Sequence, residues 1–125
     1  MVAREFPRDN GTKQLWELVR TGVQCGAYSK PILFRPDLVT AIDYALGAHD
    51  CRVAGAVRYL PSGALRLLHF KRLGWAYYWS RIQQLKARSD PQDIAEGYSQ
   101  HYCYAMDTHW EEFNRMIKHA VDVIT

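Results

Sequence analysis

Residues 65–89 read LRLLHFKRLGWAYYWSRIQQLKARS, and the spacing of the apolar residues changes within this stretch. At its start, alternation of side chains favours a strand over residues 64–71, which places His69 and Lys71 on one face at the carboxyl end. Farther on, aromatic and aliphatic residues recur at helical spacing and predict a helix over residues 74–89. The stretch therefore joins a strand to a helix, and two polar groups at the junction could reach one anion together.

The rest of the chain carries further short elements. Residues 37–49 fit either a helix or a strand, and a turn followed by a strand is the interpretation that we favour. Near the end of the chain, Thr108 and Glu111 have the spacing of a capping box that precedes an apolar face. We also expect a short helix over 11–22 capped by Thr12, a strand over 30–36, a loop over 50–63, mostly loop over 90–105 and a helix over 108–123.

These elements predict an α/β fold of the α+β-like kind, in which few strands are packed with about three helices. A chain of 125 residues fits one small domain or a piece of a larger one. The strands are too few for a self-sufficient doubly wound sheet, and no nucleotide-binding βαβ unit precedes the first helix. We therefore expect residues 1–125 to form a single partial domain that packs on something else.

The composition argues against several classes of protein. Hydrophobic residues make up 48% of the chain, which argues against disorder. No apolar run approaches the roughly 20 residues of a membrane span, and the first residues do not read as a secretory signal. The three cysteines are widely spaced and form no C-x-x-C pair. We expect reduced thiols in a cytoplasmic protein, with attachment to the cytosolic face of a membrane as a further option.

The positive charge is concentrated in one segment. The net charge is only +3, yet residues 51–89 contain no aspartate or glutamate. Such a segment creates a positive local field, which favours an anion site for a nucleotide diphosphate, another phosphate or nucleic acid. The alternative is a set of solvated charges that point in different directions. The basic residues of the segment are Arg52, Arg58, Arg66, Lys71, Arg72, Arg81, Lys86 and Arg88.

Two histidines, His69 and His49, are candidates for binding, whereas His101 is interpreted as part of the core or of a loop. A neutral imidazole at His69 could bind a divalent metal, while the ammonium of Lys71 could pair with a phosphate. The alternative is a partly buried histidine and a lysine that covers apolar surface with its stem. His49 follows a predicted strand and is well placed to face a site, although a histidine in a loop is more often structural. His101 and Cys103 share a face if the chain is extended, but two ligands do not make a metal site.

Short motifs follow one another between residues 28 and 102. They are YSKPILFRPD (28–37), GAHDC (47–51), LRLLHFKRLG (65–74), Arg81 with the RSD of residues 88–90, and GYSQHY (97–102). In this order they resemble the C-terminal portion of bacterial glycosyltransferases of the family-two type, which have the GT-A fold. The most specific part is LLHFKRLG together with the upstream GAH.

The resemblance implies transfer of a sugar from a nucleotide-diphosphate sugar to a hydroxyl of a glycan or lipid-linked acceptor. It implies Mn²⁺ or Mg²⁺ in the complete enzyme, held by a D-x-D motif that this chain lacks. It makes His69 the contact for metal or diphosphate and Lys71 a diphosphate contact. His49, Arg81 and Arg88 are the further diphosphate candidates, and no catalytic base is identified. Without the nucleotide-binding half, we expect the chain to be inactive alone and to need an N-terminal half as partner.

A second class of function is a small basic module without enzymatic activity, which binds nucleic acid or a phosphorylated partner. Basic residues interleaved with aromatic residues permit this interpretation. However, they are spread over a predicted loop, strand and helix, and the chain carries no nucleic-acid-binding signature. Nucleic acid is therefore the weaker alternative.

Overall fold

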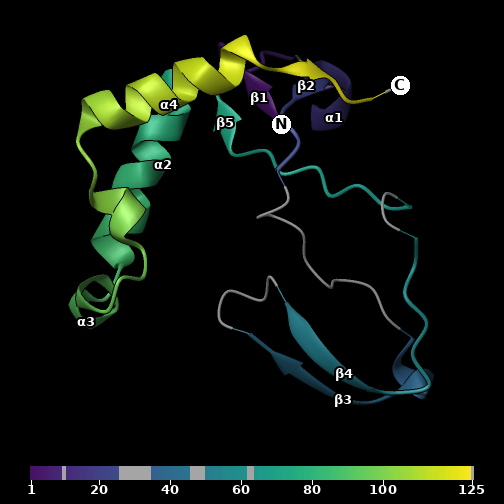
Figure 1. Ribbon diagram of the computed structural model, residues 1–125. Coiled ribbons are helices and arrows are strands. Elements are labelled where there is room, and N and C mark those ends of the chain that lie inside the picture. The colour runs from purple at the N-terminus through teal and green to yellow at the C-terminus, as the bar shows by residue number, and fades with distance from the viewer. Residues whose placement is uncertain (10, 26–34, 46–49, 62–63, 125) are drawn as a thin grey trace. The chain divides into compact units, whose positions relative to one another are not determined.

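The computed structural model describes residues 1–9, 11–25, 35–45, 50–61 and 64–124 (Figure 1). The chain separates into two compact units. Met1–Val23 together with Phe70–Thr125 form the first, which we call the helical unit. Gln24–His69 form the second, which we call the hairpin unit.

Two long helices build the core of the helical unit. They are α2 (Trp75–Arg88) and α4 (Met106–Lys118), which pack against each other (Figure 1). Tyr78 and Ile82 lie four residues apart and therefore share one face of α2, which meets Phe113 of α4. All three side chains are buried, and each stabilises the fold by about 2 kcal/mol because its apolar surface is removed from water. Partly buried neighbours complete the cluster: Trp75, Trp79, Tyr102 and Ile117.

Two very short ladders tie the ends of the helical unit together. β1 (Val2–Ala3) pairs in parallel with β5 (Arg72–Leu73). β5 directly precedes Gly74, which caps the N-terminal end of α2. β2 (Thr21–Gly22) pairs antiparallel with β6 (Val121–Asp122), just after α4. Between β1 and β2 lies the single helical turn α1 (Leu15–Leu18). Four segments far apart in sequence are thereby held in one unit.

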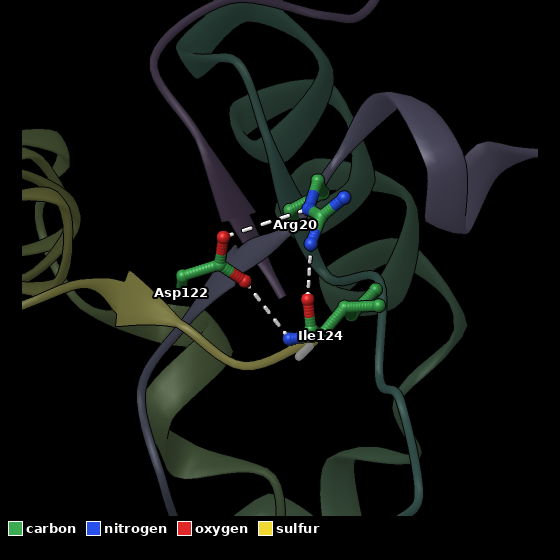
Figure 2. Close-up of polar contacts among 3 residues, drawn as sticks. All are labelled: Arg20, Asp122 and Ile124. Carbon is green, nitrogen blue, oxygen red and sulfur yellow. Dashed lines mark hydrogen bonds and ion pairs between the residues drawn. The ribbon is translucent and has the colours of Figure 1, made fainter.

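Polar contacts reinforce the β2–β6 ladder (Figure 2). The Arg20 carbonyl accepts a hydrogen bond from the Val123 N–H at 3.0 Å. The Arg20 side chain donates to the Ile124 carbonyl, and its Nε lies 3.5 Å from Asp122 Oδ2. Asp122 Oδ1 accepts from the Ile124 N–H at 3.0 Å. Because the Arg20 and Asp122 side chains are half exposed, this ion pair adds at most about 1 kcal/mol.

The hairpin unit contains one antiparallel pair of strands. After the 3₁₀ turn η2 (Pro36–Leu38), β3 (Val39–Tyr44) pairs with β4 (Cys51–Gly55), with Ile42 opposite Val53. Half-buried and exposed residues alternate along β4, as expected for strands with one covered face. Among the described residues of this unit, none is fully buried.

The mixed helix-and-strand character predicted from the sequence is confirmed, with four α-helices and three two-stranded sheets in the described part of the chain. The helix predicted over 74–89 is α2, and the turn and strand predicted within 37–49 are η2 and β3. Assignment to the GT-A fold and the single partial domain stay predictions. No helix in the described residues has the length and apolar character needed to span a membrane.

Several local predictions are wrong. No strand forms over residues 64–71, because β5 begins only at Arg72, where β1 offers a partner for its backbone. The loop predicted over 50–63 contains β4. Residues 90–105 contain α3 (Pro91–Ala95) and the 3₁₀ turn η4 (Gln100–Cys103).

The predicted helix ends also differ. The C-terminal helix begins two residues before Thr108, with Ala105 as its cap, so the predicted capping box is absent. It stops at Lys118, and β6 occupies the end of the predicted 108–123 range. The N-terminal helix is only α1, which Gln14 rather than Thr12 precedes as the cap.

The strand predicted over 30–36 cannot be compared along most of its length. Residues 30–34 lie outside the described part of the chain, and Pro36 begins η2.

Candidate anion-binding site

The predicted site residues are distributed over both units. His69 is exposed in the hairpin unit, whereas Lys71 is half-buried in the helical unit. The strand that would have placed both on one face is not formed. Arg81 and Arg88 are exposed on α2, and His49 lies outside the described residues. Their proposed roles stay predictions.

Lys71 lies beside two side chains from a distant part of the sequence. Its Nζ is 5.8 Å from the centre of the Tyr102 ring, a cation–π distance. The imidazole of His101 contacts the same ring, with 3.9 Å between the two ring centres. Lys71 immediately precedes β5, and both partners belong to η4. The Tyr102 ring therefore contacts the ammonium group of Lys71 and the imidazole of His101, which lie about 30 residues apart in the sequence.

The turn that the chain makes after α2 determines the position of η4. Asp90 caps α3 by accepting a hydrogen bond from the Gln92 N–H at 2.7 Å. Ser99 then takes a left-handed conformation, with φ of 59°, immediately before η4. The Gln100 side chain also donates to the Ile94 carbonyl at 3.3 Å. These local bonds turn the chain back, so that Tyr102 packs on the core of the helical unit.

Arg72 is a second cation, next to Lys71 in the sequence, and belongs with Lys71, His101, Tyr102, His109 and Glu112 to what we call the Lys71 cluster. It is buried, with 6% of its surface exposed. Its guanidinium pairs with Glu112 of α4 and lies 5.4 Å from the centre of the Tyr78 ring. Pairing with a carboxylate offsets the cost of burying the charge. Nε of Arg72 is buried and has no hydrogen-bond partner among the described residues. Glu112 is thus already engaged with a cation inside the unit.

His109 lies in the core between α2 and α4, with 2% of its surface exposed. Its Nδ1 is 3.1 Å from the hydroxyl of Tyr78. When that hydroxyl donates, the neutral ring carries its proton on Nε2. Nε2 is buried without a hydrogen-bond partner of normal geometry in the described part of the chain, although the His101 backbone lies close enough to favour a proton on the ring. Aromatic rings of Trp79 and Tyr104 surround it.

The environment lowers the pKa of both histidines. Partial burial is the main cause for His101, followed by repulsion from Lys71, while Glu112 acts in the opposite direction. Burial is also the main cause for His109, opposed by Glu112 and the His101 backbone and reinforced by Lys71 and Arg72. Both pKa values lie below the ordinary 6.5, so both rings are mainly neutral at pH 7. A neutral imidazole can still donate one hydrogen bond to an anion.

Sequence reasoning missed three members of the Lys71 cluster. The spacing of His101 and Cys103 indicates no more than core or loop, Arg72 is one of eight basic residues in the acid-free segment, and no motif includes His109. A signal for His109 was present, because it precedes Phe113 by four residues and so falls on the apolar face of α4. No local pattern indicated that η4 would reach Lys71.

The described residues do not form a metal cage. They include no group of three or more histidine, cysteine, aspartate or glutamate residues placed to hold a metal ion. No group of that size includes His69 within the described part of the chain.

No protein-family model, curated protein or solved structure matches this chain.

Proposed function

We propose that the helical unit binds the diphosphate of a nucleotide sugar with Lys71 and His101, as part of a glycosyltransferase that transfers the sugar to an acceptor hydroxyl. The observation that carries this proposal is the placement of the Lys71 ammonium and the His101 imidazole on the same Tyr102 ring. His101 is exposed and Lys71 is only half-buried, so a ligand in solvent can reach the pair.

The charges around the pair favour an anion. Lys71 is the cation with the largest effect on the pKa of His101, whereas the charges of Arg72 and Glu112 offset each other in an ion pair. In sugar transfer, negative charge grows on the departing diphosphate as its bond to the sugar breaks. A lysine ammonium and an imidazole N–H held in place by packing would stabilise that charge without having to reorganise. This is the role that the resemblance to glycosyltransferases assigns to Lys71.

The proposal keeps the other expectations of the resemblance. The acceptor is a glycan or lipid-linked hydroxyl, and Mn²⁺ or Mg²⁺ serves the complete enzyme. Because the described residues lack a metal cage, the N-terminal half of the enzyme would supply the acidic ligands. Lys71 and His101 would contact diphosphate oxygens directly, and this contact would not require the N-terminal half.

Calorimetry on the full chain tests this proposal, with UDP-glucose and GDP-mannose as ligands in the presence and absence of Mn²⁺. We expect binding, and Lys71→Ala should weaken it by about tenfold or more, because a charge-assisted contact is lost. Lys86→Ala is the matched control, since Lys86 is an exposed lysine near the far end of α2. Absence of binding to both ligands, or equal losses in the two variants, contradicts the proposal.

One observation favours the second candidate, a basic module that binds nucleic acid. Arg81 and Arg88 are exposed and lie seven residues apart on α2, which places them on the same side of the helix. If this face binds oligonucleotides, affinity should fall steeply with salt, and replacing both arginines with alanine should reduce the slope by about two. Fluorescence anisotropy with a labelled oligonucleotide measures both quantities. Salt-independent affinity would eliminate this candidate.

A further inference from the structure

The ammonium group of Lys71 and the imidazole of His101 both lie next to the ring of Tyr102 in the helical unit, at 5.8 Å and 3.9 Å from its centre. Lys71 and Arg72 come from the segment around β5, and His101 and Tyr102 come from η4. Glu112 and His109 of α4 also act on His101. Lys71, Arg72, Glu112 and His109 therefore all influence whether His101 carries a proton.

We infer that an anion bound beside Lys71 is accompanied by uptake of a proton on His101, so that the site binds anions more tightly as the pH falls from about 8 to about 6. This inference rests on the proposed function insofar as it uses the same site. It adds a form of regulation that the sugar-transfer proposal does not require.

The physical basis is a reversal of the local charge. Without an anion, partial burial is the main cause that lowers the pKa of His101, and the positive charge of Lys71 next to the same Tyr102 ring lowers it further. An anion next to Lys71 cancels part of the repulsion from Lys71 and attracts the protonated ring. By thermodynamic linkage, a ligand that favours the proton is itself favoured by the proton. One coupled proton can change affinity by at most about tenfold per pH unit.

His101 is the group that takes up the proton, and His109 is not. His101 is exposed, so its charged form can be hydrated and can contact the anion. His109 is buried, its Nδ1 is engaged by the Tyr78 hydroxyl, and aromatic rings surround it. A charge on His109 would lose its hydration, which is costly inside the core.

Calorimetry in two buffers of different ionisation enthalpy tests the inference on the full chain. Sulfate and UDP-glucose are the ligands, because neither titrates between pH 6 and pH 8. At about pH 7 we expect net proton uptake with both, and affinity should rise roughly threefold to tenfold between pH 7.5 and pH 6. His101→Gln should bind more weakly, because a contact to the anion is lost, and its remaining affinity should show neither the proton uptake nor the pH dependence. His119→Gln, at the exposed end of α4, controls for loss of an imidazole.

The two ligands separate this inference from the proposed function. Proton-linked binding of sulfate without binding of UDP-glucose supports the inference and contradicts the sugar-nucleotide proposal. Binding of both ligands without proton uptake overturns the inference and leaves the proposed function standing. Uptake that persists in His101→Gln also overturns it, because another group then takes the proton. Failure of both ligands to bind overturns both proposals.

Discussion

The hydroxyl of Tyr78 lies 3.1 Å from Nδ1 of His109 and so joins α2 to α4 inside the core of the helical unit. Both side chains are almost completely buried. A polar pair in such a place stabilises the fold only while both partners are present, since either one alone would be buried without its hydrogen bond.

Removing the hydroxyl should destabilise the helical unit. In Tyr78→Phe, Nδ1 of His109 remains buried without its partner, and we expect a loss of about 1–3 kcal/mol in the free energy of unfolding. Tyr77→Phe is the matched control, because Tyr77 is 41% exposed on the same helix and should change by less than about 0.5 kcal/mol. Urea unfolding followed by circular dichroism measures both. Equal midpoints for the two variants would contradict the structural role of the pair.

Stability should decrease in mild acid. The folded pKa values of His101 and His109 lie below 6.5, whereas the unfolded chain has ordinary histidines. Between the two values the unfolded chain binds more protons, so stability is present above about pH 6.5 and is lost as the pH falls through the folded values. Urea midpoints at about pH 7.5, 6.5 and 5.5 measure this trend.

Replacement of His109 separates its share of this pH dependence. His109→Gln should be less stable at neutral pH but should show a shallower decline in acid, with His119→Gln as the control for an exposed histidine. An unchanged decline in His109→Gln would show that other groups cause the acid sensitivity.

The Arg72–Glu112 and Arg20–Asp122 ion pairs of the helical unit should differ strongly in their contribution to the free energy of unfolding. Glu112→Gln leaves the buried guanidinium of Arg72 without its counter-charge, and we expect a loss of about 2–4 kcal/mol, because Glu112 itself is 33% exposed and partly screened. Asp122→Asn removes the charge opposite Arg20, where both side chains are about half exposed, and should cost less than about 1 kcal/mol. Unfolding midpoints at low and high salt compare the pairs. Similar losses in the two variants would refute this ranking.

Gly74 should not tolerate a side chain. Its φ is +82°, and a Cβ there would lie 2.4 Å from the backbone nitrogen of Phe6. Gly74→Ala should therefore cost about 2 kcal/mol or more, from backbone strain together with displacement of the N-terminal segment. Gly97→Ala shares the positive φ, at +97°, but its Cβ would meet no described atom within 4 Å. The difference between the variants in thermal unfolding isolates the contact with Phe6, and a difference near zero would refute that contact.

The accuracy of the sequence-based predictions follows the range of the interactions involved. α2 was predicted well, because the spacing of Tyr78 and Ile82 is a local property that any packed helix requires. β5 and β1 were not, since strands of two residues have no period to detect and exist only because their partner is near. The strand expected over 64–71 failed for the same reason. An apolar run favours a strand only where another backbone is available to pair with it.

The acid-free basic segment and the apolar faces of α2 and α4 can be read directly from the amino-acid sequence. Each of these follows from residue types at fixed spacing, which folding does not change. The tertiary structure alone brings Lys71 to the Tyr102 ring beside His101 and buries His109 against Tyr78. Both arrangements depend on the turn through α3 and η4, which brings the chain back to β5. Contacts between such distant residues arise from packing and loop closure, which no local pattern in the sequence reports.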